Sequence, residues 1–268
     1  MYLLLDIGGT SIKVGISRDK TSLDANEVIN TNPNFLQAVE EIKQTAFKLS
    51  GSESFDLVAG GTRALDRTKT KLVNQPNFPL WVDEPLKDTL EKEFNCKVYL
   101  ENDAAMAGLG EAVFGAGKGK DIIAYITVST GLGGARIVKG KIDVSHFGFE
   151  PGNQIIVVDG KVNYLENLVG GAGIKKMFAQ HPGDIKNPKV WEETAKYLAI
   201  GLNNTIVHWS PEVVILGGSV MKSISLEKVR ACLNEFLKIF PEKPELKLAE
   251  LEEKTGLYGA LAYLKQLS

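Results

Sequence analysis

Acidic, hydroxyl and glycine residues gather in short segments that lie between predicted strands. The first, Asp6-Ile7-Gly8-Gly9-Thr10, follows an apolar run, and Lys13 lies three residues further on. Glycines let backbone N–H groups approach phosphate oxygens closely, and the threonine hydroxyl adds a donor. A carboxylate at the end of a strand can hold Mg²⁺ through water. The whole string therefore predicts a phosphate site, whereas Gly-Gly alone would favour an ordinary hairpin turn.

Two further glycine segments are weaker signals when each is taken alone. Ser129-Thr130-Gly131-Leu132-Gly133-Gly134 offers the same hydroxyl and backbone donors at a turn between strands. It is not a P-loop, because no Gly-Lys-Ser/Thr follows, and not a dinucleotide fingerprint, because a strand rather than a helix follows. Ile215-Leu216-Gly217-Gly218-Ser219 ends a buried run. Its glycines leave room for a flat ring or a ribose, but the segment alone would be a plain strand-to-helix turn.

Carboxylates and amides that suit a polyol lie elsewhere in the chain. Glu101-Asn102-Asp103 stands where a predicted strand becomes a small-residue helix. Asparagine donates to and accepts from sugar hydroxyls, and aspartate accepts a hydroxyl proton in phosphoryl transfer. The alternative is a helix cap, which is common before an alanine-rich helix. Glu150, Asn153 and Glu166 can grip vicinal hydroxyls, or they are solvated loop residues.

The composition excludes several classes of protein. The 268 residues, 44% of them apolar and 24% charged, predict one or two globular domains. A net charge of −2 without a basic run argues against a nucleic-acid partner. No apolar run is long enough to span a membrane, and the start has no basic signal-peptide region. Two cysteines, Cys96 and Cys232, make no disulfide framework. We therefore expect a cytoplasmic protein.

Apolar periodicity predicts strands that alternate with helices, and hence an α/β fold. The strands are expected at 2–6, 11–17, 56–61, 97–103, 121–129, 135–141 and 212–218. Helices are expected at 34–49, from Pro85, at 104–114 and 188–209, after Ser225, and at 258–267. Asn34, Asn187 and Ser225 are expected to cap three of these helices. Strand, glycine turn and strand occur twice, at 6–15 and 127–140. This repetition indicates a duplicated domain with a ligand between the halves.

The motifs, in their order, resemble those of the ASKHA phosphotransferases and, within them, the ROK family of sugar kinases. DIGGTSIKVG (6–15) and TVSTGLGGARIVKGK (127–141) are similar to the two phosphate motifs, ENDAAMAGLGE (101–111) to the segment with the catalytic aspartate, and PEVVILGG (211–218) to the adenosine motif. PNFPLW (76–81) is similar to the sugar-side loop, FGFEPGN (147–153) stands at the family's Glu-x-Gly-His, and YLE (164–166) at its Cys-Leu-Glu.

The resemblance implies a two-domain ASKHA (ribonuclease H-like) fold with an interdomain cleft. The expected domains are 1–102 with about 256–268, and 103–255. The implied activity is ATP-dependent phosphorylation of a hexose or N-acetylhexosamine at C6, with ATP and Mg²⁺ as cofactors and Asp103 as the base. Asp6 would hold Mg²⁺ through water.

The implied ATP-binding residues are Asp6, Gly8, Gly9, Thr10, Lys13, Thr130, Gly131, Gly133, Gly217 and Gly218. The implied sugar-binding residues are Asn77, Asn102, Glu150, Asn153 and Glu166. Sugar and ATP are the expected partners, with no nucleic acid or membrane, and the resemblance is compatible with a homodimer.

Three departures from the family pattern bear on these expectations. Residues 155–165 lack the cysteines of the family's zinc cluster, and Asn153 stands in place of its histidine. We therefore predict no zinc, and a strand at Ile155–Val158. AGGTRALD (59–66) replaces the family's Gly-x-Pro-Gly turn. No helix-turn-helix, which the family's repressors carry, precedes Asp6, so we expect a kinase rather than a repressor.

Two other functions stay open at this point. One is a catalytically idle sugar sensor on the same fold, against which the presence of Asp103 argues. The other is an ATPase of the actin/Hsp70 type, against which the ENDAA segment and the short chain argue. The sugar also stays open, because glucose, mannose, fructose, N-acetylmannosamine and N-acetylglucosamine all suit a polyol site.

Overall fold

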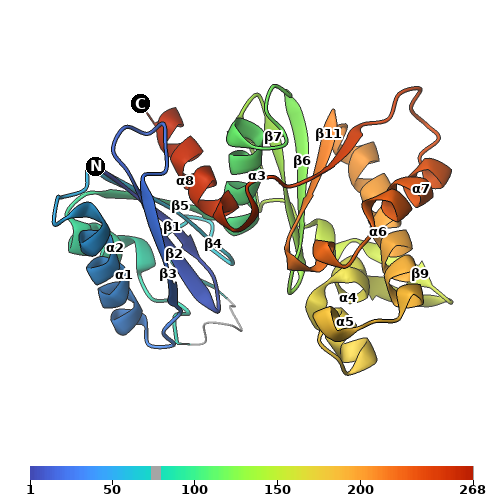
Figure 1. Ribbon diagram of the computed structural model, residues 1–268, viewed down its shortest axis with the longest axis horizontal. Helices are drawn as coiled ribbons and strands as arrows, with labels where there is room; N and C mark the ends of the chain where they lie inside the picture. Colours follow the sequence, from blue (N-terminus) through green and yellow to red (C-terminus); the bar gives the residue numbers. More distant parts are fainter. Residues whose placement is uncertain (74–79, 268) are drawn as a thin grey trace. The chain divides into compact units, whose positions relative to one another are not determined.

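The computed structural model describes residues 1–73 and 80–267 (Figure 1). The chain forms two compact units, residues 1–114 with 253–268 (unit 1) and residues 115–252 (unit 2). The sequence placed the division at 102/103, so the observed division differs by the helix 103–114, which groups with unit 1. Asn77 and most of PNFPLW lie outside the described residues.

Unit 1 is built on a five-stranded sheet in the order β3-β2-β1-β4-β5. Its strands are β1 (Tyr2–Ile7), β2 (Ser11–Ser17), β3 (Ala25–Asn30), β4 (Leu57–Thr62) and β5 (Lys97–Asn102). β1, β4 and β5 are parallel, whereas β2 is antiparallel to both β1 and β3. Helices α1 (Phe35–Ser50) and α2 (Leu86–Phe94) share one apolar core with the sheet. Helix α8 (Thr255–Gln266) forms another with Leu4 and Ala59.

Helix α3 (Asp103–Phe114) packs on α8 with almost no side chain between the two backbones. A Cβ atom on Gly259 would lie 1.8 Å from the Met106 carbonyl oxygen, and one on Gly110 would lie 2.5 Å from that of Thr255. Only glycine permits this approach. The close packing explains why the last helix of the chain, and α3 with it, belong to unit 1.

Unit 2 repeats the strand order of unit 1. Its sheet runs β12-β11-β6-β7-β8, with β6 (Ile122–Val128), β7 (Leu132–Val138), β8 (Lys141–Ile142), β11 (Val213–Gly217) and β12 (Glu245–Leu248). β6, β11 and β12 are parallel, and β7 is antiparallel to both β6 and β8. In each unit the first strand therefore has an antiparallel strand on one side and a parallel strand on the other, and each of these pairs with one further strand. The α/β class is confirmed, and the shared order agrees with the predicted duplication.

Helices α4 (Leu165–Val169), α6 (Pro188–Trp209) and α7 (Leu226–Phe236) share the core of unit 2 with one face of the sheet. Helix α5 (Gly171–Phe178) contributes Ile174 to the same core. Short 3₁₀ turns occur at Pro151–Asn153, Pro182–Asp184, Ser219–Lys222 and Glu252–Lys254. Helices α4 to α7 together cover one face of the sheet that carries the second glycine turn.

Local capping signals give the helix boundaries. Asn34 accepts a hydrogen bond from the Gln37 amide, and Gly51, with φ of 67°, ends α1. Asn187 and Ser225 cap α6 and α7 in the same way, by accepting from the Lys189 and Lys228 amides. These caps are confirmed, whereas α8 begins three residues before the predicted Tyr258.

Strand β7 begins at Leu132, and the prediction of a strand from 135 was wrong. Gly133 and Gly134 therefore lie within the strand, opposite Thr127 and Ile126. Close packing explains why position 134 is glycine, because a Cβ atom there would lie 2.7 Å from Pro151 Cγ. The turn itself is confined to residues 129–131.

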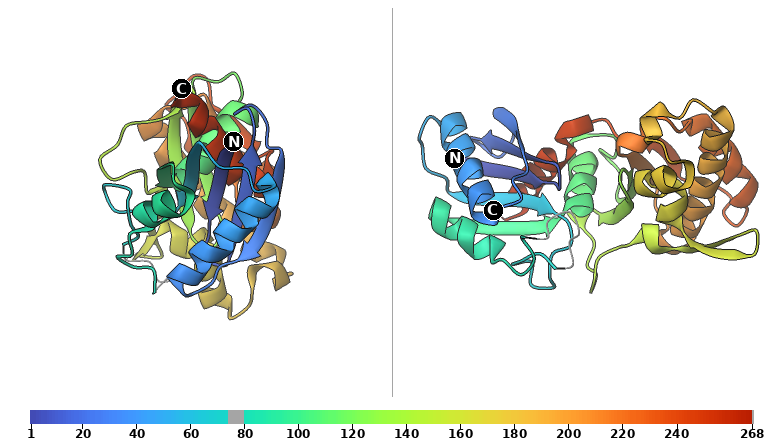
Figure 2. Two further views of the ribbon diagram at one scale, coloured as in Figure 1. Left: turned by 90° about the vertical axis from the view of Figure 1, so that its left-hand side faces the viewer. Right: turned by 90° about the horizontal axis from the view of Figure 1, so that it is seen from below.

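A hairpin occupies the segment at which the resemblance placed zinc ligands (Figure 2). It consists of β9 (Ile155–Val158), as predicted, and β10 (Lys161–Tyr164). Ile156 is buried in the core of unit 2, whereas Ile155 and Val157 are exposed.

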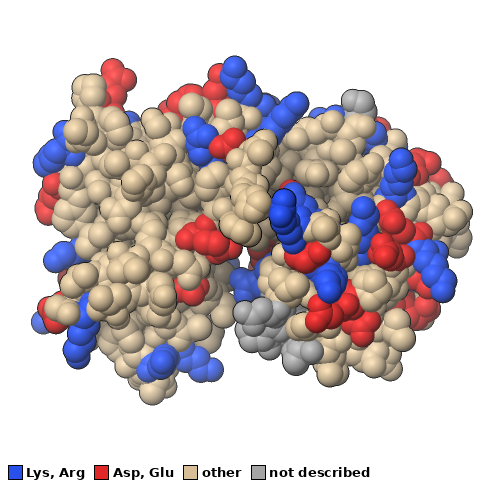
Figure 3. Space-filling model, turned by 180° about the vertical axis from the view of Figure 1, so that it is seen from behind, with Lys and Arg blue, Asp and Glu red and all other residues tan. Residues whose placement is uncertain are grey.

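Charges of both signs are interspersed over the face drawn in Figure 3. None of the helices in the described part of the chain is both long and apolar enough to cross a membrane.

Candidate active site

The first glycine turn is held from the end of β3. The Gly8 amide donates to the Ser11 carbonyl at 3.0 Å, and the Thr31 amide donates to the Thr10 carbonyl at 2.9 Å. The Thr31 hydroxyl donates to the Gly8 carbonyl at 2.6 Å. These bonds fix the turn while Gly9 and Thr10 stay exposed, as a turn that receives phosphate requires.

The carboxylate of Asp6 lies beside this turn. Lys13, its cross-strand neighbour on β2, places Nζ 2.6 Å from Asp6 Oδ2. Gly256, in the first turn of α8, leaves room for it, since a Cβ atom there would lie 2.6 Å from Asp6 Cγ. The Asp6 side chain remains 18% exposed. A partly exposed carboxylate at a strand end fits Mg²⁺ held through water.

Asn102 and Asp103 stand at the junction of β5 and α3, and their oxygens have different partners. Asn102 Oδ1 accepts from the Ala105 amide at 3.1 Å. This is the helix cap considered above as an alternative. Asp103 Oδ1 accepts from the Ala104 amide at 2.8 Å, and its Oδ2 lies 3.6 Å from Nε of Arg63. The Asn102 side chain therefore caps α3 through its oxygen.

The surroundings of Asp103 alter its acidity. Loss of hydration raises the pKa of Asp103, and the charge of Asp6 adds to the rise, whereas Arg63 and the Ala104 amide oppose it. The net direction is upward. A carboxylate with a raised pKa accepts a proton more readily, which suits a general base.

The second glycine turn lies in unit 2, between β6 and β7. The Ser129 amide donates to the Gly131 carbonyl at 2.9 Å. The Gly171 and Ala172 amides, at the start of α5, donate to the Ser129 and Thr130 carbonyls, each at 2.8 Å. The start of α5 therefore fixes the turn, and Thr130 is left exposed.

Three of the predicted sugar residues lie around this turn. A Cβ atom on Gly131 would lie 2.8 Å from Glu166 Oε2, and one on Gly152 would lie 3.2 Å from Glu166 Cβ. Gly152 is the middle residue of the 3₁₀ turn, which Glu150 precedes and Asn153 ends. The exposed Asn153 donates its backbone amide to the Glu150 carbonyl at 3.1 Å. The fold thus brings Glu150, Asn153 and Glu166 to one place in unit 2.

Gly217 and Gly218 end β11 close to the same turn. Gly218 has φ of 94°, and a Cβ atom on it would lie 2.2 Å from the Val128 carbonyl oxygen. Ser219, which follows, places its Oγ 3.5 Å from that of Ser129. The two glycine segments of unit 2 are therefore neighbours in space as well as similar in composition.

Comparison with known proteins identifies the family. The model of the ROK family matches residues 2–267. The chain belongs to the ROK family. It is 33% identical over 302 residues to a glucokinase of Streptomyces coelicolor, and the match covers 96% of this chain and 95% of that enzyme.

Solved ROK structures have the same fold. A ROK hexokinase from Thermus thermophilus matches with a TM-score of 0.83 and 27% identity, over 99% of both chains. A ROK family glucokinase from Streptomyces griseus, solved in complex with glucose and AMPPNP, matches with a TM-score of 0.81 and 25% identity, again over 99% of both chains. The predicted ROK membership and ASKHA-type fold are confirmed.

In this ROK protein, residues 155–165, which stand where the family pattern has its zinc cluster, contain no cysteine. Among the residues that the structure describes, no three His, Cys, Asp or Glu side chains are grouped to hold a metal ion. Whether the protein contains zinc stays a prediction.

Two features of this ROK protein were not predicted. The Gly170–Ala172 segment that holds the second turn had only its run of small residues as a signal. On the segment between β4 and the undescribed residues, Arg63 pairs with Asp103 and Lys69 pairs with Glu101. The signal for Arg63 was that AGGTRALD (59–66) departs from the family's Gly-x-Pro-Gly, and Lys69 lies beyond that segment.

Proposed function

We propose that this ROK protein is an ATP-dependent sugar kinase that phosphorylates the C6 hydroxyl of a hexose or N-acetylhexosamine. The observation that carries the proposal is the place of Asp103, whose carboxylate stands at the start of α3 with its side chain 35% exposed and therefore open to a hydroxyl group. The similarity to a ROK glucokinase bound to glucose and AMPPNP supports it.

Asp103 accepts the proton of the attacking hydroxyl. The hydroxyl oxygen forms a bond to the γ-phosphorus of ATP while the bond from that phosphorus to the bridging oxygen breaks, so that a sugar phosphate and ADP result. Positioning and electrostatics supply most of the rate in this class of reaction.

The glycine turns are assigned to the nucleotide. Backbone groups of Gly8, Gly9 and Thr10 in unit 1, together with Lys13, bind phosphate oxygens. Thr130, Gly131 and Gly133 in unit 2 have the same role, and Gly217 with Gly218 accepts the adenosine. Asp6 would hold Mg²⁺ through water, and the ion when bound supplies charge neutralisation on the phosphates.

The remaining polar residues are assigned to the sugar. Glu150, Asn153 and Glu166 bind hydroxyls in unit 2, and the side-chain nitrogen of Asn102 binds one in unit 1. Asn77 remains in this set on the strength of the resemblance. We also propose that the protein acts in the cytoplasm. We further propose that it forms a homodimer, which analytical ultracentrifugation would detect.

An enzyme-linked assay of ADP release, run with and without a panel of hexoses and N-acetylhexosamines, tests the proposed function. We expect ATP turnover that depends on one or a few sugars, and phosphorus NMR of the product should place the new phosphate on C6. No turnover with any sugar would favour an idle sugar sensor, and turnover that is indifferent to sugar would favour an ATPase.

A further inference from the structure

The segment that follows β4 is an ordered turn. The Val73 amide donates to the Ala64 carbonyl at 2.8 Å, and the Asp66 amide donates to the Lys71 carbonyl at 2.9 Å. Leu65 and Leu72 form a bridge between the two arms. We call residues 63–73 the Asp66 turn, because the carboxylate of Asp66 organises its tip.

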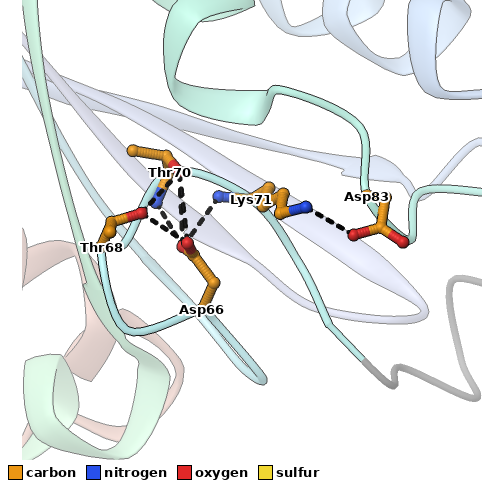
Figure 4. Close-up of polar contacts among 5 residues, drawn as sticks. All are labelled: Asp66, Thr68, Thr70, Lys71 and Asp83. Carbon is orange, nitrogen blue, oxygen red and sulfur yellow. Dashed lines mark hydrogen bonds and ion pairs between the residues drawn. The ribbon is translucent and has the colours of Figure 1, made fainter.

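Figure 4 shows how Asp66 does so. Its Oδ1 accepts from the Thr70 amide at 2.7 Å and from the Lys71 amide at 3.2 Å, and the Thr68 hydroxyl donates to Oδ2. Lys71 Nζ lies 2.7 Å from Asp83 Oδ1, which ties the turn to the segment before α2. The backbone that carries Arg63 and Lys69 is therefore fixed from within.

Asp66 stays ionised across the range in which enzymes work. Partial burial raises the pKa of Asp66, but the hydrogen bonds from Thr68, Thr70 and Lys71 outweigh this and lower it to about 2. Titration of Asp66 is therefore not a source of any pH effect on catalysis above about pH 4.

The Asp66 turn supplies a cation to each carboxylate of the segment 101–103. Lys69 Nζ lies 2.5 Å from Oε2 of Glu101, whose side chain is only 9% exposed. Glu101 Oε1 accepts from the Asn102 amide at 2.9 Å. Arg63 places Nε 3.6 Å from Asp103 Oδ2, and its side chain is 39% exposed.

In the described part of unit 1, the other charged groups around Asp103 have partners of their own. Asp6 on β1 is paired with Lys13 on β2, and Glu101 on β5 is paired with Lys69. On α8, Lys265 lies over the ring of Phe114, at the opposite end of α3 from Asp103. Among the described residues of unit 1, Arg63 is therefore the cation that is ion-paired with the Asp103 carboxylate.

We propose that Arg63 is a positioning residue for Asp103, whose guanidinium holds Oδ2 and keeps the carboxylate ionised until it accepts the sugar proton. This inference rests on the proposed function, in which Asp103 is the base. An opposite charge within about 4–6 Å favours the ionised form of a carboxylate. Loss of hydration raises the pKa of Asp103, and Arg63 opposes that rise. The base therefore stays ionised, and able to accept a proton, at lower pH than it would without Arg63.

The first test is the pH profile of kcat/KM for the best sugar. In Arg63→Gln the acid limb should move to higher pH by about one unit, because the charge that favoured the ionised form is gone. Arg63→Lys should return the limb toward its wild-type position. Arg67→Gln is the matched control, since Arg67 lies exposed on the same turn, and it should leave the limb in place. An unmoved limb in Arg63→Gln, or an equal movement in Arg67→Gln, would overturn the inference.

The second test needs no turnover. Carbon-13 NMR of the aspartate carboxyls, with the Asp103 signal assigned by its loss in Asp103→Asn, gives the pKa of Asp103 in the full chain. That pKa should rise in Arg63→Gln, and an unchanged value contradicts the inference even if the protein is an active kinase. If the wild type phosphorylates no sugar, the proposed function fails and the NMR titration still decides the role of Arg63. Circular dichroism checks the fold of each variant, and Arg63→Ala replaces Arg63→Gln if the latter does not fold.

Discussion

Two adjacent residues, Asn102 and Asp103, show what a motif leaves undecided. Both suit a helix cap and both suit a sugar site, so their types alone do not separate the two roles. The structure divides them: the Asn102 oxygen accepts from the Ala105 amide, and Asp103 Oδ2 faces Arg63. The sequence identified the segment, but the roles depend on contacts with the Asp66 turn, which is far away along the chain.

Asp103→Asn should lower kcat by about 10²–10⁴-fold while the affinity for sugar changes little. The amide keeps the shape of the carboxyl and its bond from the Ala104 amide, but it accepts no proton at neutral pH. Steady-state kinetics with the best sugar and binding calorimetry measure the two effects. Asp88→Asn, an exposed change on α2, is the control. A near-normal kcat would leave Asp103 as a helix-start residue only.

Asn153→Ala should raise the KM for sugar about tenfold, or ~1.4 kcal/mol, which fits the loss of one hydrogen bond to a polar ligand. Asn153 is exposed beside Glu150, and its amide offers both donors and an acceptor. Asn163→Ala is a suitable control, because Asn163 donates to the Lys161 carbonyl within the hairpin. An unchanged KM in Asn153→Ala would make Asn153 a turn residue.

At the scale of elements, helix caps could be predicted from neighbouring residues, whereas strand boundaries that depend on distant contacts could not. The caps at Asn34, Asn187 and Ser225 depend on neighbouring residues and were predicted. The start of β7 was wrong because Gly133 and Gly134 signal a turn locally, whereas Gly134 is small to admit Pro151. β3 was not predicted, since much of its surface is exposed and its apolar pattern is weak.

Gly259→Ala tests the packing of α3 against α8. Helix propensity alone would predict stabilisation by up to about 1 kcal/mol. The added Cβ atom would lie 1.8 Å from the Met106 carbonyl oxygen, so the helices must separate. We expect the free energy of unfolding to fall by roughly 1–3 kcal/mol, the usual cost of overpacking. Urea unfolding measures it, with Gly183→Ala as the control, because there the nearest atom lies at 3.4 Å. A stabilised Gly259→Ala would show that the helices do not need glycine.

At the scale of the whole molecule, the repeated strand–turn–strand pattern predicted the architecture better than it predicted the boundaries. Both sheets have the same strand order, as a duplication requires. The division at 102/103 followed the motif at Asp103, but α3 packs on α8 at the other end of the chain. Such packing has no local signal beyond the glycines at 110 and 259.

The whole molecule should fold without zinc. Residues 150–166 contain no cysteine and no histidine, and a structural zinc site needs four nitrogen or sulfur ligands within tetrahedral reach. The chain holds this segment in another way. β9 pairs with β10, the Leu165 amide donates to the Gln154 carbonyl at 2.9 Å, and Ile156 is buried.

Elemental analysis of dialysed protein should therefore find no stoichiometric zinc, and EDTA should leave the midpoint of thermal unfolding unchanged. EDTA should still stop sugar phosphorylation, and Mg²⁺ should restore it, because the proposed reaction uses MgATP. A Zn²⁺ chloride titration of the same sample is the control for adventitious binding. One zinc per chain that survives dialysis, or a midpoint that falls with EDTA, would mean that ligands outside residues 150–166 have taken over the role of the missing cysteines.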